Sequence, residues 1–293
     1  MDGTDRQRTL ARAVTLTGIG FFTNADVTLR LQPAAADTGI VFCRIDRPGR
    51  PTIPARIENV VPAERRTAIA ADGARVELIE HLMAALAGLQ VDNCRIEIDG
   101  PEVPGFDGSS RPFVDAIDRA GTIALDRPPR RLKPQEAVHV GNCGAGIRFE
   151  PNGDAGLQVT YRLDYGRAAP IAAGAVTEPI TADVFRERIA SARTFVLQRE
   201  VAVLRAAGYG RRVGAKDLLV LDDDGRPVDN VFRFADECPR HKLLDVVGDL
   251  ALVGARLSGR VVAERSGHAL NHALARRLRE TARATETPQD RAA

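Results

Sequence analysis

The stretch Arg240-His241-Lys242-Leu243-Leu244-Asp245-Val246-Val247-Gly248-Asp249 is the segment around which the rest of the chain is organised. Pro239 precedes it, as a proline in the first turn of a helix does. Gly254 follows it at a place where a helix can end. The apolar residues between these points fall at mixed helical spacing, which predicts a largely buried helix. They are Leu243, Leu244, Val246, Val247 and Leu250.

His241, Asp245 and Asp249 follow one another at intervals of four residues and therefore share one face of the predicted helix. A histidine and an aspartate one turn apart can both reach the same metal ion. The spacing also fits a helix with two hydrogen-bonded carboxylates and a core histidine, because short motifs often match by chance. The other segments of the chain must decide between these interpretations.

A second histidine, His81, follows Glu80 in a segment with strong helix propensity. Adjacent helix residues point about 100° apart, so Glu80 would lie beside any metal that His81 held. That is the position a general base needs. Taken alone, the pair also fits a surface acid next to a core histidine. Among the other histidines, His268 lies in a strand-to-helix turn, His272 is expected on the surface, and His139 is assigned no role.

The composition is that of an ordinary globular protein, with 44% hydrophobic and 27% charged residues. The net charge of +2 gives no case for a nucleic acid partner. No apolar run approaches the ~20 residues of a membrane span, and the polar N-terminus lacks the features of a secretory signal, so no stable membrane insertion is expected. The four cysteines form no Cys-x-x-Cys pair, which predicts reduced thiols in a cytoplasmic protein and argues against a cysteine metal site.

Sequence periodicity predicts several strands and two main helices in each half of the chain. In the first half the strands fall within 8–32, 39–43 and 94–98, and the helices at 77–88 and 112–120. In the second half the strands fall at 157–163, 216–221 and 258–264, and the helices near 182–190, 199–207, 240–250 and 269–283.

These elements predict an α+β fold of two similar domains, each a mainly antiparallel sheet with two main helices. The proline-rich segment Asp126-Arg127-Pro128-Pro129-Arg130-Arg131 is the predicted linker. The domains then span 1–127 and 131–283, followed by a disordered tail over 284–293. Sequence similarity between the halves is too weak to establish a duplication.

Five motifs, in one order, resemble those of the zinc-dependent UDP-3-O-acyl-N-acetylglucosamine deacetylases of lipid A biosynthesis. The resemblance covers about residues 8–280. Its motifs are Glu80-His81-Leu82-Met83-Ala84-Ala85-Leu86-Ala87-Gly88-Leu89, Pro101-Glu102-Val103-Pro104 with Asp107-Gly108-Ser109, Ala192-Arg193-Thr194-Phe195, the central stretch through Leu250, and Ser266-Gly267-His268-Ala269-Leu270-Asn271. This context favours the metal-binding interpretation of the central helix.

The resemblance implies a zinc ion held by His81, His241 and Asp245, with one position open for water. It makes Glu80 the general base, which takes the proton of a water molecule acidified by zinc as that water attacks the acetyl carbonyl. Iron and cobalt accept the same ligands, so the sequence leaves the metal in the cell open.

The resemblance also implies roles for residues around the metal. The Thr194 hydroxyl would help zinc to hold the oxyanion that forms. His268 would be a protonated imidazole that stabilises the transition state or protonates the leaving amine, and Asp249 would keep it charged and oriented. Lys242 would contact the anionic nucleotide sugar. Arg265 stands where the family often carries a lysine, and it would face the pyrophosphate.

By the same resemblance, the helices of both domains face one another around the zinc, and an insert near 195–229 forms an apolar passage for the acyl chain. The residues that suit this passage are Phe195, Leu197, Val201, Leu204, Leu218, Leu219 and Val220. Ordinary core packing is an equally good explanation for any single one of them.

Several positions depart from the family pattern. Phe22 stands where a histidine is usual, Leu78 where threonine is favoured, and Val196 where a glycine is usual. The pair Arg211-Arg212 lies where two glycines are common. Because none belongs to the metal or acid–base set, we expect these residues to affect the fit of the substrate and to favour a shorter or differently placed acyl chain.

Three functions therefore stay open. The first is a monomeric, cytoplasmic zinc hydrolase that removes the N-acetyl group from UDP-3-O-acyl-N-acetylglucosamine, the committed step of lipid A biosynthesis. The second is a zinc amidohydrolase for another acylated amino sugar or nucleotide sugar. The third is a non-catalytic paralog that only binds. The complete acid–base and ligand set argues against the third, because a chain freed from catalysis has no need for a base beside a metal.

Overall fold

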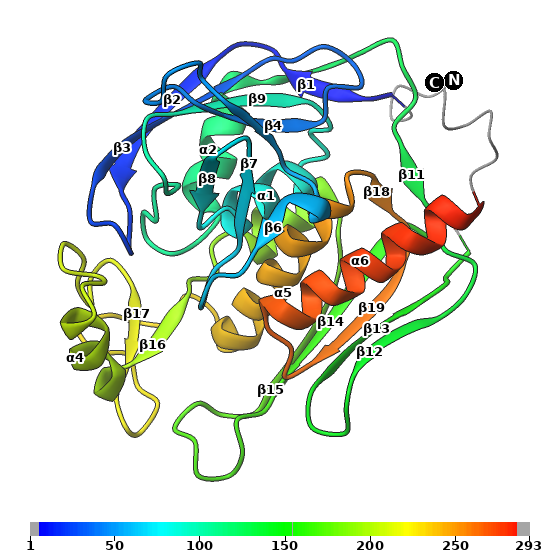
Figure 1. The fold of residues 1–293 in the computed structure, drawn as a ribbon. Helices are drawn as coiled ribbons and strands as arrows, with labels where there is room; N and C mark the ends of the chain where they lie inside the picture. Colours follow the sequence, from blue (N-terminus) through cyan, green and yellow to red (C-terminus); the bar gives the residue numbers. More distant parts are fainter. Residues whose placement is uncertain (1–5, 154, 286–293) are drawn as a thin grey trace.

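Two five-stranded sheets lie on opposite sides of a double layer of helices (Figure 1). The computed structural model describes residues 6–153 and 155–285. The predicted α+β class is confirmed. Within the described residues no helix is long and apolar enough to cross a membrane.

Both sheets have the same strand topology. In each, a hairpin, a central last strand and a second hairpin lie side by side, and the only parallel pairing is between the central strand and the first strand of the second hairpin. The first sheet has the order β2 (Val14–Ile19), β3 (Asp26–Gln32), β9 (Cys94–Ile98), β4 (Ile40–Arg44) and β5 (Thr52–Pro54). The second has the order β12 (Val138–Gly141), β13 (Gly146–Glu150), β19 (Gly259–Glu264), β14 (Leu157–Leu163) and β15 (Gly174–Pro179).

The main helices repeat in the same way, one before and one after the central strand of each sheet. They are α1 (Glu80–Gly88) and α2 (Arg111–Ala120) in the first half, and α5 (Glu237–Leu250) and α6 (His268–Thr285) in the second. The repeat fits the prediction of two similar units, although the boundaries at 127 and 131 stay a prediction.

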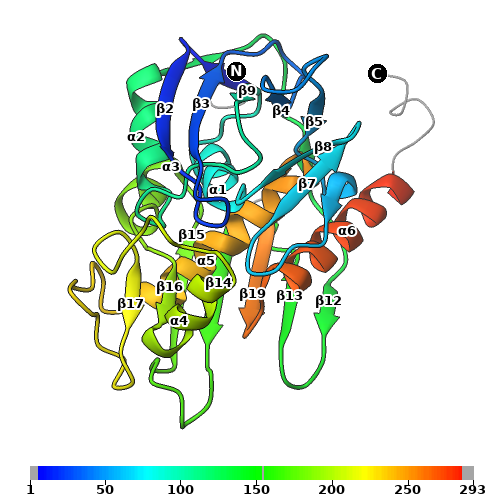
Figure 2. The same ribbon diagram turned by 60° about the vertical axis from the view of Figure 1, so that its left-hand side comes forward.

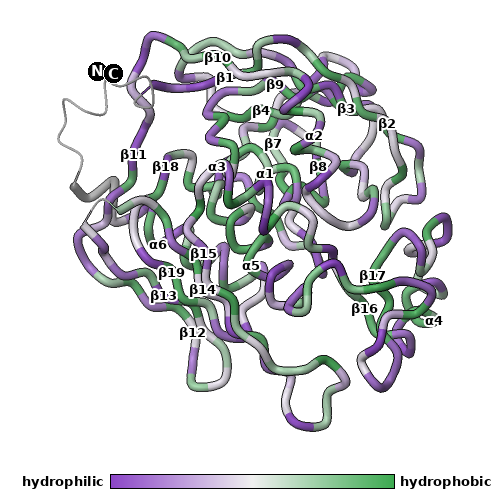
Figure 3. The backbone as a smooth tube through the Cα atoms, turned by 180° about the vertical axis from the view of Figure 1, so that it is seen from behind, coloured by the Kyte–Doolittle hydropathy of each residue, from purple (hydrophilic) through white to green (hydrophobic). Residues whose placement is uncertain are grey.

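Helix α5 lies at the centre of the molecule, against α1 on one side and β14 on the other. All its residues except Lys242 are buried, as the sequence predicted. At Gly248 an added Cβ would stand 2.1 Å from the backbone oxygen of Glu80, so glycine lets α1 and α5 approach closely. Figure 3 shows hydrophobic residues along these inner helices and strands, with hydrophilic residues in the outer loops.

The remaining elements are short. They are β1 (Arg8–Leu10) paired with β10 (Thr122–Ala124); β11 (Arg131–Leu132) paired with β18 (Arg256–Leu257); the sheet of β6 (Val60–Val61), β7 (Ala68–Ala71) and β8 (Ala74–Glu77); and the turns η1 (Ile57–Asn59), α3 (Ala182–Val184), η2 (Phe185–Ile189) and η3 (Ala251–Val253).

The insert forms a small unit of its own, in which β16 (Phe195–Leu197) and β17 (Leu219–Leu221) pair in parallel around α4 (Gln198–Ala206). The turn between β2 and β3 holds it in place (Figure 2). Asn24 donates from Nδ2 to the Gly208 carbonyl at 2.7 Å and accepts at Oδ1 from the Arg211 backbone N–H at 2.7 Å. The Phe22 and Tyr209 rings meet edge to face, 5.0 Å between centroids.

Several element boundaries differ from the sequence prediction. Helix α5, predicted over 240–250, already begins at Glu237. Helix α1 begins at Glu80 instead of Glu77, because Glu77 ends β8 and Leu78 has a left-handed φ of 58°. The strand predicted over 216–221 covers only Leu219–Leu221, because 214–218 form a turn. Strand β15 was not predicted. Helix α6 extends two residues beyond the predicted end at 283, and residues 286–293 of the predicted tail lie outside the described residues.

Candidate active site

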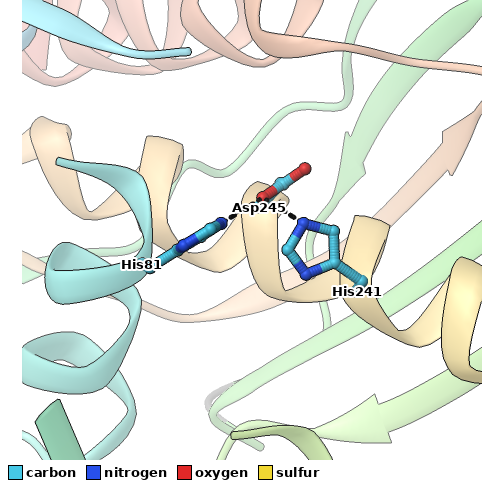
Figure 4. Close-up of side chains that lie close together, drawn as sticks. All are labelled: His81, His241 and Asp245. Carbon is cyan, nitrogen blue, oxygen red and sulfur yellow. Dashed lines mark ion pairs between the residues drawn. The ribbon is translucent and has the colours of Figure 1, made fainter. Parts of the chain in front are cut away.

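Three buried side chains from two helices converge near the centre of the molecule (Figure 4). His81 comes from α1, and His241 and Asp245 come from α5; their ligand atoms lie within 4.8 Å of one another. Asp245 Oδ1 is 3.3 Å from His241 Nε2 and 3.7 Å from His81 Nε2. These are the three residues that the sequence predicted as metal ligands.

The bonding of this cluster fits a cation. The Oδ1 atom of Asp245 is buried without a hydrogen-bond partner, whereas Oδ2 accepts from Lys242 Nζ at 2.7 Å. His241 Nδ1 is 3.1 Å from the Ala192 carbonyl oxygen and must donate to it, which leaves the Nε2 lone pair facing Asp245. One carboxylate oxygen and two imidazoles with available nitrogens form a donor set typical of zinc and of several other divalent metals.

The charges of the three residues also suit metal binding. Burial, with His241 nearby, lowers the pKa of His81 to about 3. Burial likewise lowers the pKa of His241, so both imidazoles are neutral. For Asp245, burial raises the pKa, but nearby positive charge, including the Lys242 ammonium that donates to Oδ2, outweighs burial and holds the pKa below its usual range. The cluster is thus two neutral imidazoles and one carboxylate, the protonation states in which these groups bind metals.

Backbone contacts position the ligands. The motif that supplies the Ala192 carbonyl continues with Arg193, whose guanidinium is held by the fully buried carboxylate of Glu237 at 2.8 Å. On the other side, Ser110 donates to the His81 carbonyl at 2.7 Å. The neighbouring motifs therefore orient the ligand-bearing segments.

Glu80 and His268 lie together beside the ligand cluster. His268 Nε2 is 3.9 Å from Glu80 Oε1, and Glu80 Oε2 accepts from the Thr67 backbone N–H at 3.0 Å. Burial raises the pKa of Glu80 to about 7. Burial lowers the pKa of His268, but the Asp249 carboxylate outweighs that effect and raises it to about 9. At neutral pH the site therefore holds a weakly basic carboxylate beside an imidazolium.

Asp249 is completely buried and bonds to more than the one residue that the sequence suggested. His268 Nδ1 donates to its Oδ2 at 2.8 Å, as expected. Asn271 also donates to Oδ2 at 2.8 Å, and the Thr67 hydroxyl donates to Oδ1 at 2.5 Å. His272 Nε2 is 3.3 Å from Oδ1.

The prediction that His272 lies on the surface is wrong, because the residue is 7% exposed and its side chain faces Asp249. His272 follows His268 by four positions, about one helical turn, so both side chains point from α6 towards α5. That spacing was a signal in the sequence. Thr67 offered no such signal, since a threonine in a short strand-like segment is common.

A cavity of about 1440 Å³ opens onto this group. Glu80, Thr194 and His268 line it together with the ligand cluster and Lys242. An apolar wall extends from there into the insert. Of the predicted passage residues, the wall includes Phe195, Leu197, Val201, Leu204, Leu218 and Val220, whereas Leu219 is fully buried behind it.

Other predicted residues lie in different places. Arg265 is outside this cavity and lines a separate pocket of about 80 Å³. Phe22, Leu78 and Val196 do line the main cavity. The pair Arg211-Arg212 does not; its contacts are with the β2–β3 turn, including an Arg212–Asp26 ion pair at 2.9 Å.

Comparison with known proteins gives a single family. The family profile described as "UDP-3-O-acyl N-acetylglycosamine deacetylase" (LpxC) matches residues 7–280. Proteins named UDP-3-O-acyl-N-acetylglucosamine deacetylase from Anaeromyxobacter sp. (strain Fw109-5) and Myxococcus xanthus (strain DK1622) are each 38% identical over 273 residues, covering 93% of this chain and 88% and 86% of theirs. The protein of that name from Hahella chejuensis (strain KCTC 2396) is 36% identical over 276 residues, 93% of this chain and 90% of its own. Because the profile and these relatives span nearly the whole chain, including both helices that form the cluster, the chain belongs to the UDP-3-O-acyl N-acetylglycosamine deacetylase family.

Proposed function

We propose that this protein removes the N-acetyl group from UDP-3-O-acyl-N-acetylglucosamine in lipid A biosynthesis, with zinc held by His81, His241 and Asp245. The observation that carries the proposal is the orphaned Oδ1 of Asp245, which faces two neutral imidazoles in the wall of a large cavity with an apolar extension. The curated relatives are named for this deacetylation. When bound there, zinc supplies Lewis acidity, which polarises the amide carbonyl and acidifies a water molecule.

In the proposed reaction Glu80 is the general base and His268 the general acid. Glu80 takes one proton from the water whose oxygen attacks the acetyl carbon; the Thr67 N–H fixes Oε2 of Glu80, and Oε1 lies on the side of His268. As the carbon–nitrogen bond breaks, His268 gives its Nε2 proton to the amine, and acetate is the other product. Asp249 holds the opposite nitrogen of His268, so the ring stays charged until it donates.

Two further residues are assigned to substrate contacts. Thr194 lines the cavity, and its hydroxyl is assigned to donate to the oxyanion that develops on the acetyl oxygen. Lys242 is 21% exposed in its side chain and lines the same cavity, so its ammonium can meet the anionic nucleotide while it holds Oδ2 of Asp245. The apolar wall formed by the insert receives the acyl chain.

A second candidate keeps the chemistry but changes the substrate to another acylated amino sugar. It rests on Phe22, Leu78 and Val196, which depart from the family pattern and line the cavity. A non-catalytic paralog is disfavoured by the pairing of Glu80 with His268 beside the ligand cluster. The four free cysteines support a cytoplasmic location for the enzyme. A monomeric state stays a prediction.

Turnover by the purified protein tests the proposal. We expect acetate release from UDP-3-O-acyl-N-acetylglucosamine, dependent on a divalent metal and restored best by zinc after chelation. Glu80→Gln should keep the metal and lose nearly all turnover, because it removes the base and leaves the ligands. Release of acetate from other acylated amino sugars, with none from this substrate, would instead support the second candidate.

A further inference from the structure

The hydrogen-bond pattern around Asp249 determines the tautomer of His272. The pKa of Asp249 is held low because His268, with its positive charge, outweighs burial; its carboxylate can therefore only accept. The Thr67 hydroxyl has one proton, and at 2.5 Å from Oδ1 it must donate that proton to Asp249. His272 Nε2 lies 2.9 Å from the same hydroxyl oxygen. Because that oxygen has no second proton to give, Nε2 of His272 must carry one and donate it.

Thr67 thereby connects the two groups of the acid–base pair. Its backbone N–H donates to Oε2 of Glu80, and its hydroxyl donates to the carboxylate that holds His268. His272 fixes the orientation of that hydroxyl, and its ring lies parallel to the His268 ring, 6.2 Å between centroids and 26° between planes. The chain of donors runs from His272 through Thr67 to Oδ1 of Asp249, next to the oxygen Oδ2 that holds His268. The Thr67 hydroxyl oxygen also lies 3.3 Å from Nδ1 of His268.

We propose that His272 is a positioning residue for the deacetylation: by donating from Nε2 to Thr67, it fixes the hydroxyl on Asp249 and so controls how firmly Asp249 holds His268. This inference rests on the proposed function only for its kinetic consequence, since the hydrogen-bond arrangement itself does not depend on the reaction. His272 does not touch the main cavity, so its role differs from that of the groups that meet the substrate.

The charges that surround His268 set the expected direction of the effect. Asp249 and Asp245 face it from α5, Glu80 from α1 and His272 from its own helix, and it interacts at longer range with His81 and His241. The Thr67 hydroxyl and the Nε2–H of His272 draw negative charge from Oδ1 of Asp249. Without the His272 donor, Asp249 holds the proton of His268 more strongly, so His268 gives it up less readily.

The test compares His272→Phe with His272→Gln. Phenylalanine fills the space without a donor, whereas the glutamine amide can place N–H where Nε2 stands. For His272→Phe we expect kcat to fall roughly tenfold with KM and metal content unchanged, and the alkaline limb of the pH–rate profile to move up by about half a pH unit. In His272→Gln, kcat and the position of the alkaline limb should both be close to those of the wild type. His139→Phe, which changes an exposed histidine on β12, is the matched control and should match the wild type.

A measurement without turnover separates this inference from the proposed function. In ¹⁵N-histidine NMR of the metal-loaded wild type, His272 should be the Nε2–H tautomer, and the titration of His268 should move to higher pH in His272→Phe. Should that variant fail to fold, Thr67→Val removes the hydroxyl that links His272 to Asp249 and should also move the titration of His268 to higher pH. Thr67→Ser keeps the hydroxyl and is its control. An Nδ1–H tautomer at His272 would overturn the inference. So would variants in which the His268 titration and the alkaline limb of the pH–rate profile stay at their wild-type positions. Absence of turnover in the wild type would count against the proposed function alone.

Discussion

Asp245 uses its two carboxylate oxygens for different purposes, and this gives the first prediction. Oδ2 is tied to Lys242, while Oδ1 is free of hydrogen bonds and faces both histidines. In the proposed site three protein ligands hold the ion, so losing one leaves too few for tight binding. Zinc should therefore be lost from His81→Ala, His241→Ala and Asp245→Ala, as measured by metal analysis of the purified variants.

The exposed histidine of β12 again provides a control, since His139→Ala removes an imidazole without touching the cluster. It should retain one zinc per chain. Full zinc occupancy in all three ligand variants would disprove the metal assignment, whatever their activity.

The pH dependence of the rate is the second prediction, and its two limbs have opposite signs. The base Glu80 must be ionised, so activity is lost as pH falls through its pKa, which burial raises to about 7. A bound dication favours the carboxylate, which places this limb at or below that value. The acid His268 must be protonated, so activity is lost as pH rises through its pKa of about 9. The profile of kcat/KM should be bell-shaped.

His268→Gln distinguishes the limbs, because glutamine cannot titrate. Its residual activity should no longer fall at alkaline pH. An unmoved alkaline limb in this variant would mean that another group is the acid.

The clustering of His81, His241 and Asp245 could be predicted from sequence because helical spacing places neighbouring residues together and the family resemblance joined the two segments into one site. Asp245 and His241 are one helical turn apart, and Glu80 adjoins His81. The surroundings of Asp249 could not be predicted in the same way. Thr67 reaches Asp249 across 182 positions of the chain, and only tertiary packing brings such residues together. His272 was missed for a different reason, since its spacing from His268 was visible but the buried side of α6 was not.

The contact between α1 and α5 gives a prediction about the helices. His81 is on one helix and the other two ligands are on the other, so the spacing of the helices sets the spacing of the ligands. A Cβ at Gly248 would meet the Glu80 carbonyl at 2.1 Å, which forces the helices apart. Gly248→Ala should cost about 1–3 kcal/mol of unfolding free energy and weaken zinc binding. Denaturant melts and zinc titrations measure the two effects.

Gly174→Ala is the matched control, because a Cβ there makes only an ordinary contact of 3.5 Å with Pro239. It should leave zinc affinity unchanged. Equal zinc affinity in Gly248→Ala would show that the helices can separate without disturbing the ligands.

The start of α1 shows why helix boundaries are harder to predict than helices. Propensity favours a helix from Glu77, and most of the segment is helical. The left-handed φ of 58° at Leu78 ends β8 and turns the chain, so that Glu80 opens the helix and faces the cavity. Such a conformation is rare for leucine and is imposed by the surrounding fold. Sequence propensity carries no information about it.

The docking of the insert gives a prediction for the whole molecule. The insert supplies the apolar wall of the cavity, and Asn24 joins it to the first half through two hydrogen bonds. Asn24→Ala should loosen the insert, raise KM for the acylated substrate and leave kcat nearly unchanged. Hydrogen exchange should quicken in α4. Asn59→Ala, which loses one hydrogen bond to the Pro54 carbonyl, is the control. It should change neither KM nor the rate of hydrogen exchange in α4.

Acyl-chain preference is the last prediction, and it concerns the shape of the cavity. Phe22, Leu78 and Val196 place bulk on its wall, and accommodating a longer chain against that bulk costs about 1–3 kcal/mol. We expect kcat/KM to be highest for a shorter or differently placed acyl chain than the family's long 3-hydroxyacyl group. A series of UDP-3-O-acyl substrates that differ only in chain length measures this preference.

Val196→Gly, which restores the usual family residue, should shift the optimum towards longer chains. If the wild type already prefers the long chain and shorter ones react poorly, the three substitutions do not control chain length.

The first and the last of the three proposed metal ligands are synthesised at different times. His81 belongs to the first of the two repeated units, and Asp245 follows 164 positions later, in the second. At ~5–20 residues per second, about 10–30 seconds pass between them on the ribosome. For most of that interval the nascent chain carries His81 and His139 but neither His241 nor Asp245, so the ligand set is incomplete. The proposed metal site is therefore complete only when the second half of the chain has emerged from the ribosome.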